Sequence, residues 1–198
     1  MQIVLASNNS GKIKELKELL NDFPVTITPQ ATLGVTVVEE TGLSFVENAL
    51  LKARHACTQT GLPAIADDSG LAVAALHGEP GIYSARYAGE NANSADNINK
   101  LLANLDGVPD EKRQAFFYCV LVYMTHANDP VPLICSAKWH GIILQQPRGH
   151  DGFGYDPIFY IPSEMKSAAE LLPAVKNKMS HRGMALQSLL KLLPEKFQ

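Results

Sequence analysis

The order of apolar patterns along this chain predicts an α/β or α+β protein built around a mixed β-sheet. In the first part, short buried runs alternate with stretches of helical periodicity, as in a sheet with crossover helices. In the middle part, long β-type runs follow one another without a helix between them, and an amphipathic helix closes the chain. We expect a single domain over residues 1–198, in which the middle strands, roughly 115–160, form a smaller second lobe.

Each expected element carries a local signal. Residues 3–6 form an apolar run that ends in polar residues, which is typical of a buried strand. One helix opens with the capping-box pattern Ser44-Phe45-Val46-Glu47, and His140-Gly141 is expected to kink the chain between two strands. By these criteria we expect strands at 3–6, 63–66, 71–76, 115–124, 133–139, 142–144 and 158–161. We expect helices at 11–20, 44–60, from Ser94 as N-cap to about 105, and at 180–193.

Composition and charge argue against several classes of protein. The formal net charge of −3 gives no electrostatic attraction to nucleic acid or anionic membranes, so we expect neither as a partner. Cys57, Cys119 and Cys135 lie far apart in apolar runs without the spacing of metal ligands, as in a reduced cytoplasmic protein. The apolar run at 3–6 is too short for a signal peptide or a membrane span.

The run of small residues at 63–66 is expected to be a strand that ends in Asp67-Asp68-Ser69-Gly70. Adjacent carboxylates repel each other, and close to the core they cannot hydrate fully, so such a pair calls for a cation or a proton-transfer task. Strand ends are also where α/β proteins bind ligands. The same residue types are common in ordinary turns. The acidic pair is nevertheless the first candidate for catalysis.

A polar segment joins the first expected strand to the first expected helix. It consists of Ser7, Asn8, Asn9, Ser10, Gly11 and Lys12. Backbone N–H groups at a helix N-terminus favour an anion, and Gly11 would let a phosphate approach closely. Lys12 falls in the first turn, where its charge opposes the helix dipole, and a bound anion would relieve that conflict. The segment lacks the leading Gly and the final Ser/Thr of a Walker A loop.

A second pair of acids, Glu39-Glu40, precedes Thr41-Gly42 and the helix that contains Lys52. Carboxylates followed by a glycine suit a hard cation such as Mg²⁺, which takes few protein oxygens and keeps several waters. The sequence leaves open which of Glu39 and Glu40 would reach the ion.

Two later segments suit an aromatic, hydrogen-bonding ligand. In a Gly-Phe-Gly-Tyr-Asp-Pro loop, Phe153 could lie flat against a planar ring and Asp156 could accept hydrogen bonds from a base or ribose. His181 and Arg182 fall in the first turn of the last expected helix, where positive charge is electrostatically misplaced. Both side chains are therefore expected to face electron-rich ligand atoms.

Six segments, in this order, closely resemble the inosine/xanthosine triphosphate pyrophosphatase family, whose members remove non-canonical purine nucleotides. They are Ser-Asn-Asn-Ser-Gly-Lys, Glu-Glu-Thr-Gly with Glu-Asn-Ala and Lys52, Ala-Asp-Asp-Ser-Gly-Leu, Pro-Gly-Ile-Tyr-Ser-Ala-Arg, Phe-Gly-Tyr-Asp-Pro and Ser-His-Arg. The resemblance spans almost the whole chain. Many family members carry Thr where this chain has Ser7, a departure that keeps the hydroxyl.

The resemblance implies a two-lobed α/β fold with a long central mixed sheet flanked by helices, and a substrate cleft between the lobes. It implies a homodimer that uses Mg²⁺ to cleave dITP, ITP and XTP between the α- and β-phosphates, giving the monophosphate and pyrophosphate and clearing the nucleotide pool. Asp68 would be the proton acceptor and a metal ligand, supported by Glu39 or Glu40. The triphosphate would be held by Lys52 and the residues Ser7 to Lys12. The nucleoside would be bound by Ser69, Phe153, Gly154, Tyr155, Asp156, Lys176, His181 and Arg182.

The chemistry of the residues agrees with that implication. A triphosphate carries about four negative charges, so Mg²⁺, Lys12 and Lys52 suit the stabilisation of a leaving pyrophosphate. No Ser/His or Cys/His nucleophile pair is evident, which favours direct hydrolysis. Two other readings are a nucleotide sensor without turnover and a phosphotransferase. The acidic pair argues against the first, and the lack of a kinase motif set argues against the second.

Overall fold

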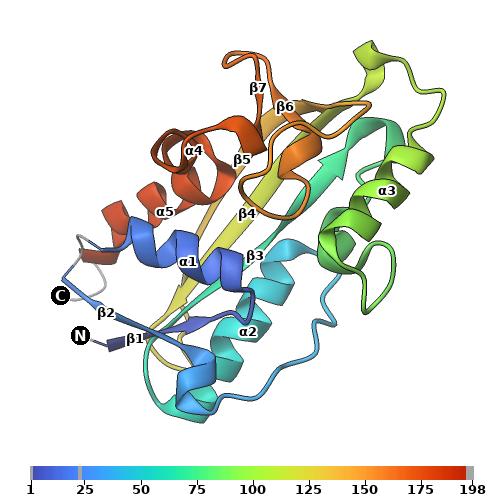
Figure 1. Cartoon of the computed structure of the whole chain (residues 1–198). Helices are drawn as coiled ribbons and strands as arrows, with labels where there is room; N and C mark the ends of the chain where they lie inside the picture. Colours follow the sequence, from blue (N-terminus) through green and yellow to red (C-terminus); the bar gives the residue numbers. More distant parts are fainter. Residues whose placement is uncertain (1, 22–23, 195–198) are drawn as a thin grey trace. The chain divides into compact units, whose positions relative to one another are not determined.

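The computed structural model describes residues 2–21 and 24–194. Within them the chain forms a mixed sheet flanked by helices, which confirms the expected fold class (Figure 1). The strands are β1 (Gln2–Ala6), β2 (Thr26–Pro29), β3 (Ala64–Val73), β4 (Gln114–Met124), β5 (Leu133–Ile143), β6 (Phe159–Ile161) and β7 (Lys166–Ser167). The helices are α1 (Ser10–Leu19), α2 (Phe45–Thr60), α3 (Ser94–Asn104), α4 (Pro173–Met179) and α5 (His181–Leu192).

The sheet combines parallel and antiparallel pairing. Its strand order is β2-β1-β3-β4-β5-β6-β7. β1 pairs parallel with both β2 and β3, whereas β6 pairs antiparallel with both β5 and β7. Parallel neighbours need long crossover connections, and α1 and α2 lie in the connections between the parallel strands.

The described residues fall into two compact units. The first takes them from Met1–Asp68, Cys119–Ala137 and Arg182–Gln198, and the second consists of Ser69–Tyr118 and Lys138–His181. The expected single domain with a smaller lobe at 115–160, and the expected substrate cleft, stay predictions.

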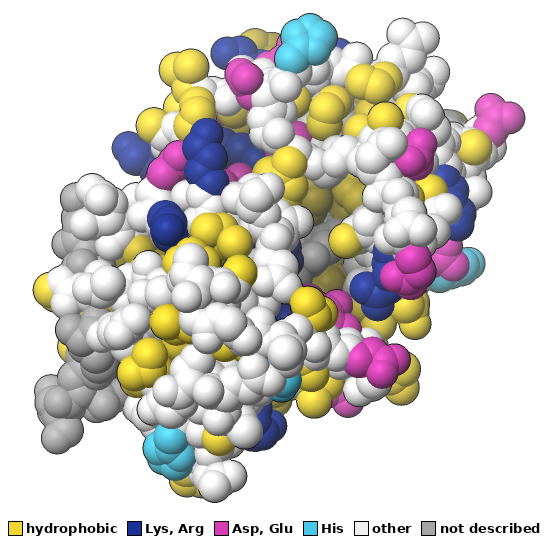
Figure 2. All heavy atoms as spheres, turned by 60° about the horizontal axis from the view of Figure 1, so that its bottom comes forward, with side chains coloured by type: hydrophobic (Ala, Val, Ile, Leu, Met, Phe, Trp, Pro, Cys, Tyr) yellow, Lys and Arg dark blue, Asp and Glu magenta, His cyan; other side chains and the backbone are white. Residues whose placement is uncertain are grey.

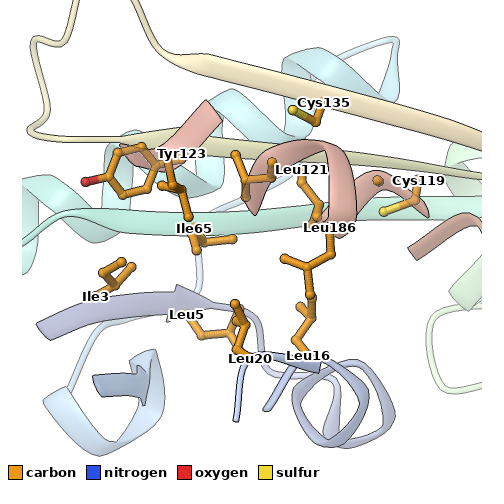
Figure 3. Packing of buried hydrophobic residues seen from close by; sticks show 13 residues of the cluster. Ile3, Leu5, Leu16, Leu20, Ile65, Cys119, Leu121, Tyr123, Cys135 and Leu186 are labelled. Carbon is orange, nitrogen blue, oxygen red and sulfur yellow. The ribbon is translucent and has the colours of Figure 1, made fainter. Parts of the chain in front are cut away.

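The core of the first unit packs α1 and α5 onto one face of β1 and β3. Ile3 and Leu5 lie two residues apart on β1, so their side chains share a face with Ile65 of β3. Leu16 of α1 and Leu186 of α5 pack against them (Figure 3). Val4 and Ala6, on the opposite face of β1, are also fully buried, and α2 contacts β1. Both faces of these strands are therefore covered.

β3 runs without interruption through the acidic pair, so the expectation of two strands separated by an acidic turn is wrong. Side chains alternate between the two faces of a strand. Asp67 therefore shares the face of Ile65, on which α1 and α5 pack, whereas Asp68 lies on the opposite face. The two carboxylates do not face each other, which removes the mutual repulsion expected from their adjacency. Each carboxylate can therefore pair with different cations.

The expected kink at His140-Gly141 is also absent, because β5 continues to Ile143. A Cβ on Gly141 would lie 2.6 Å from the carbonyl oxygen of Tyr160 and 2.6 Å from the ring of Phe159. Gly141 thus allows β6 to approach closely rather than bending its own strand. The third helix begins at Ser94 with Asn93, not Ser94, as its N-cap. β2, β7 and α4 were not expected from the sequence.

The surface carries charges of both signs. Figure 2 shows Lys and Arg side chains interspersed with Asp and Glu on the face in view, in keeping with the small formal net charge. Within the described residues, none of the helices combines the length and the apolar character that crossing a membrane requires.

Candidate active site

Asp67 is a fully buried carboxylate held by two cations of the first unit. Lys12 of α1 forms an ion pair with Oδ1, and Arg182 of α5 donates its Nε–H to Oδ2 at 3.0 Å. The Cys119 thiol donates to Oδ2 at 3.2 Å. Burial by itself would raise the pKa of Asp67, but Lys12 and Arg182 outweigh it and hold this pKa well below its usual range. Asp67 is therefore ionised at neutral pH.

The segment 7–12 forms the N-terminus of α1, as the sequence predicted. Asn9 is the N-cap and accepts a hydrogen bond from the backbone N–H of Lys12 at 3.0 Å. The Ser7 hydroxyl accepts the N–H of Asn9 at 3.2 Å, and the Asn8 side chain accepts from Gln30 at 2.9 Å. Asp67 balances the charge of Lys12 that opposes the helix dipole.

Asp68, on the other face of β3, pairs with Lys52 of α2. The Lys52 ammonium donates to Asp68 Oδ1 at 2.6 Å and to Glu40 Oε1 at 2.8 Å, so it joins two carboxylates. Burial would lower the pKa of Lys52, but Asp68 and Glu40 outweigh it and raise it. Glu40 is half-buried, whereas its neighbour Glu39 is exposed. Of the two acids that the sequence left open, Glu40 is thus the one that lies with Asp68.

Asp68 differs from Asp67 in its proton affinity. Burial raises the pKa of Asp68 above its ordinary value of 3.8 and outweighs the lowering by Lys52. Its Oδ2 atom is buried and has no hydrogen-bond partner among the residues that the structure describes. A carboxylate with a raised pKa and one uncommitted oxygen has the properties of a general base or metal ligand.

A second cluster lies in the other unit, at the loop 152–156. Asp156 Oδ2 accepts from the Lys176 ammonium at 2.6 Å and from the backbone N–H of Phe153 at 2.9 Å. The ammonium also lies 5.2 Å from the centre of the Phe153 ring. Gly152 has a φ of +80°, and a Cβ there would lie 2.1 Å from Asp156 Oδ2. The loop is therefore closed around Asp156, and only glycine fits at its start.

Tyr155 and His181 are held in place by packing within the second unit. Tyr155 is buried and its hydroxyl donates to the carbonyl of Ser84 at 2.9 Å, so it anchors the loop. His181 is buried, and its ring stacks on Phe117 with a centroid distance of 4.8 Å and an interplanar angle of 9°. Trp139 lies on the same aromatic cluster, 6.3 Å from the His181 ring. The imidazole is thus held in one orientation by aromatic packing.

Nearly the whole length of the chain matches known proteins. The sequence model of the Ham1 family matches residues 3–192. The chain belongs to the Ham1 family. The dITP/XTP pyrophosphatase of Salmonella paratyphi A is 59% identical over 192 residues, covering 97% of this chain and 98% of that protein. The dITP/XTP pyrophosphatase of Escherichia coli K12 is 58% identical with the same coverage. A solved HAM1 protein from Coxiella burnetii superposes with a TM-score of 0.91 at 54% identity, covering 98% of this chain and 99% of that one.

This membership confirms the family resemblance of the six segments. In this member of the Ham1 family, the candidate residues divide between the two units. The first unit holds Ser7, Asn8, Asn9, Ser10, Gly11, Lys12, Glu39, Glu40, Lys52, Asp68 and Arg182, and the second holds Ser69, Phe153, Gly154, Tyr155, Asp156, Lys176 and His181. Adjacent residues thus fall in different units at Asp68-Ser69 and at His181-Arg182.

Sequence reasoning missed several members of these Ham1 clusters. Glu15 forms an ion pair with Arg182 and follows Lys12 by three residues, a helical spacing that could have been noticed. Phe117 and Trp139 look like ordinary strand residues, and nothing in their local sequence links them to His181. Asn48 lies in the Glu-Asn-Ala segment, and its residue type and position alone indicate no role.

Proposed function

We propose that this Ham1 protein hydrolyses the non-canonical purine nucleotides dITP, ITP and XTP to the monophosphate and pyrophosphate. The observation that carries the proposal is the buried carboxylate of Asp68. Its Oδ1 accepts from Lys52, and its Oδ2 has no hydrogen-bond partner among the described residues. The names of the relatives from Salmonella and Escherichia coli support the substrate class, since they share more than half of their residues with this chain. Hydrolysis of this kind would remove such nucleotides from the cellular pool.

Mg²⁺ fits the residues around Asp68. Asp68 and Glu40 are brought together on Lys52, and Asp68 Oδ2 is a buried oxygen without a protein partner in the described part of the chain. Two carboxylates suit Mg²⁺, which keeps several waters, and the described residues hold no group of three or more His, Cys, Asp or Glu side chains for a closed metal site. Bound there with the substrate, Mg²⁺ would neutralise phosphate charge. We assign Asp68 and Glu40, rather than Glu39, as its ligands.

The residues of the first unit have distinct tasks in the proposed reaction. The N-terminus of α1, from Ser7 to Lys12, binds phosphate oxygens with its backbone N–H groups and the Lys12 ammonium. Lys52 stabilises the negative charge that develops on the leaving pyrophosphate. Asp68 takes the proton of the attacking water. Asp67 is unsuited to that step, because its two cations keep it ionised with a very low proton affinity.

The second unit provides the groups proposed for the nucleoside. The Phe153 ring offers a stacking surface, with Lys176 and Asp156 beside it. Lys176 and His181 can donate to the 6-keto group of hypoxanthine or xanthine, whereas adenine presents an amino donor there and would leave a buried donor unpaired, at about 1–3 kcal/mol. We therefore expect ATP to be a poor substrate. Ser69, Gly154 and Tyr155 complete the proposed nucleoside set.

Arg182 is the member of the nucleoside set whose role is most open to test. Its guanidinium donates to Asp67 and pairs with Glu15 in the first unit. If Arg182 reads the base, an Arg182→Ala variant loses ITP activity much more than ATP activity. If both activities fall equally, Arg182 serves the Lys12–Asp67 cluster instead.

A single incubation tests the reaction. Purified protein with ITP and MgCl₂ should yield IMP and pyrophosphate in equal amounts, resolved by ion-exchange chromatography. Accumulation of IDP with inorganic phosphate would contradict the proposed bond position, and IDP itself should be a poor substrate because it lacks a pyrophosphate leaving group. Binding of ITP without any product would favour a nucleotide sensor. Transfer of phosphate to an added acceptor would favour a phosphotransferase.

A further inference from the structure

The acidic loop that carries Glu40 is fastened to helix α2 at a second point. Gly42 donates its backbone N–H to Asn48 Oδ1 at 2.8 Å, two residues after Glu40. Asn48 lies in the first turn of α2, and Lys52 lies four residues later on the same helix face. Two contacts, one helical turn apart, therefore tie the segment 40–42 to α2. One is Asn48 to Gly42 and the other is Lys52 to Glu40.

The packing at Gly42 shows how closely this loop approaches the helix. A Cβ on Gly42 would lie 2.6 Å from Glu47 Cβ and 2.7 Å from Asn48 Oδ1. Real side chains do not tolerate such distances, so the loop backbone rests directly on the first turn of α2. Glu47 adds to the attachment, since its carboxylate accepts the N–H of Leu43 at 3.0 Å and the Ser44 hydroxyl at 2.6 Å. The position of Glu40 is thus set by the start of the helix.

The Nδ2 group of the Asn48 amide has a different environment from its Oδ1 atom. Asn48 is completely buried, and its Nδ2 group has no hydrogen-bond partner among the described residues. The bond from Gly42 fixes which end of the amide is the acceptor. A buried donor without an acceptor is destabilising, so its presence in a fold points to a ligand that supplies the acceptor.

We propose that Asn48 is a positioning residue of the Mg²⁺ and phosphate site. Its Oδ1 holds Gly42, and thereby Glu40, beside Lys52 and Asp68, and its Nδ2 donates to an oxygen that arrives with the Mg²⁺-triphosphate. The inference rests on the proposed function for the identity of the ligand. The attachment of Glu40 is independent of it.

Gln59 provides a matched control on the same helix. Its side-chain oxygen accepts the backbone N–H of Thr36 at 3.0 Å and its amide nitrogen donates to the Thr36 hydroxyl at 2.7 Å. Like Asn48, it ties the preceding loop to α2 through an amide, but Gln59 is exposed and lies toward the other end of the helix. A Gln59→Ala variant therefore removes a similar attachment without touching Glu40 or Lys52.

The first measurement needs no substrate. Binding of MgCl₂ and MnCl₂ to the purified protein is followed by calorimetry for wild type, Asn48→Ala and Gln59→Ala. Loss of a residue that orients a metal ligand costs roughly 10- to 100-fold in metal affinity, so we expect a loss of that size in Asn48→Ala. Gln59→Ala should stay within about twofold of wild type. Equal affinities in the two variants would overturn the positioning role of Asn48.

The second measurement separates the two ends of the amide. Asn48→Asp keeps an acceptor for the Gly42 N–H but loses the Nδ2 donor. It should bind MgCl₂ more tightly than Asn48→Ala, yet its kcat/KM for dITP should fall at least tenfold below that of Gln59→Ala. An unchanged kcat/KM in Asn48→Asp would contradict the proposed role of the Nδ2 group as a donor to the ligand.

Folding is checked by thermal melting of every variant. If Asn48→Ala does not fold, Gly42→Ala replaces it, because the added Cβ would force the loop off α2 without emptying the buried Asn48 site. Its MgCl₂ affinity should fall as expected for Asn48→Ala, and an affinity equal to wild type would overturn the proposal. If the wild type binds MgCl₂ but hydrolyses no dITP, the proposed function fails while the calorimetry still decides whether Asn48 positions Glu40.

Discussion

At the scale of single residues, one step along β3 separates two carboxylates of different chemistry. Asp67 is neutralised by Lys12 and Arg182 and keeps a low pKa, whereas burial dominates at Asp68 and raises its pKa. The first is suited to holding cations in place, and the second to accepting a proton. We therefore expect Asp67→Asn mainly to lower stability, and Asp68→Asn mainly to lower turnover.

Asp68→Asn should abolish most of the turnover and leave the fold intact. The variant loses the proposed proton acceptor and a metal-binding charge, so kcat should fall by roughly 10²–10⁴. Lys52 keeps Glu40 as a partner, so no cation is left buried alone. The measurement is dITP hydrolysis together with thermal melting. Near-wild-type turnover in a folded variant would move the base elsewhere.

Asp67→Asn should reduce stability at neutral pH. It leaves Arg182, which is 2% exposed, and Lys12 without the carboxylate between them. Breaking a buried ion pair from one side costs about 3–5 kcal/mol, which urea unfolding of the metal-free protein would measure. Asp110→Asn, at an exposed carboxylate, serves as the control and should change the unfolding free energy by less than about 0.5 kcal/mol.

The same variant has a defined pH dependence. The pKa of Asp67 is lower in the folded than in the unfolded chain, so its contribution is fully present above the unfolded pKa of about 3.9 and is lost as pH falls through the folded value. The difference in unfolding free energy between wild type and Asp67→Asn should therefore shrink below about pH 4. A difference that grows on acidification would contradict the lowered pKa assigned to Asp67.

At the scale of elements, the loop 152–156 depends on glycine at one position for space as well as for conformation. A Cβ on Gly152 would collide with Asp156, whereas a Cβ on Gly154, which also has a positive φ, would meet nothing within 4 Å. Gly152→Ala should therefore break the bond between Lys176 and Asp156. Losing a charged hydrogen bond costs about 1.5–3 kcal/mol, or roughly 10- to 150-fold in kcat/KM for dITP.

Gly107→Ala provides the control for that prediction. Gly107 also has a positive φ, an added Cβ there would meet nothing within 4 Å, and it lies outside the proposed nucleoside set. Steady-state kinetics of both variants should show the larger effect in Gly152→Ala, mainly in KM, since the loop is assigned to nucleoside binding. Equal losses in the two variants would mean that backbone strain, and not the position of Asp156, sets the effect.

At the scale of the whole molecule, the family resemblance predicts a homodimer. Light scattering at micromolar concentration should give twice the mass of one chain. A purely monomeric protein would contradict the prediction. The dimer and the cytoplasmic location stay predictions, because neither follows from the geometry of a single chain.

Much of the fold was predictable because its signals are local. The helix 44–60 opens with a capping box and the helix 180–193 is amphipathic, and both are present as α2 and α5 within one residue at each end. The two strands whose extent was predicted wrongly contain residues with strong turn preferences. Asp-Asp-Ser-Gly and His-Gly are typical of turns, yet β3 and β5 continue through them. Partly buried lysines balance the acids of β3, and Gly141 makes room for β6. Tertiary contacts outweighed local propensity at both places.

The sequence by itself determined the family and the segments that carry the chemistry, since these depend on residue types in a given order. It could not determine how those residues pair. Asp67 and Asp68 are neighbours in the chain, but the alternation of side chains in a strand places them on opposite faces, toward α1 and α5 or toward α2. Arg182 reaches Asp67 across 115 residues, and Lys52 joins Asp68 to Glu40 rather than to Glu39. Only the folded chain brings such distant charges within a few ångströms, and their mutual distances decide which carboxylate stays ionised and which can accept a proton.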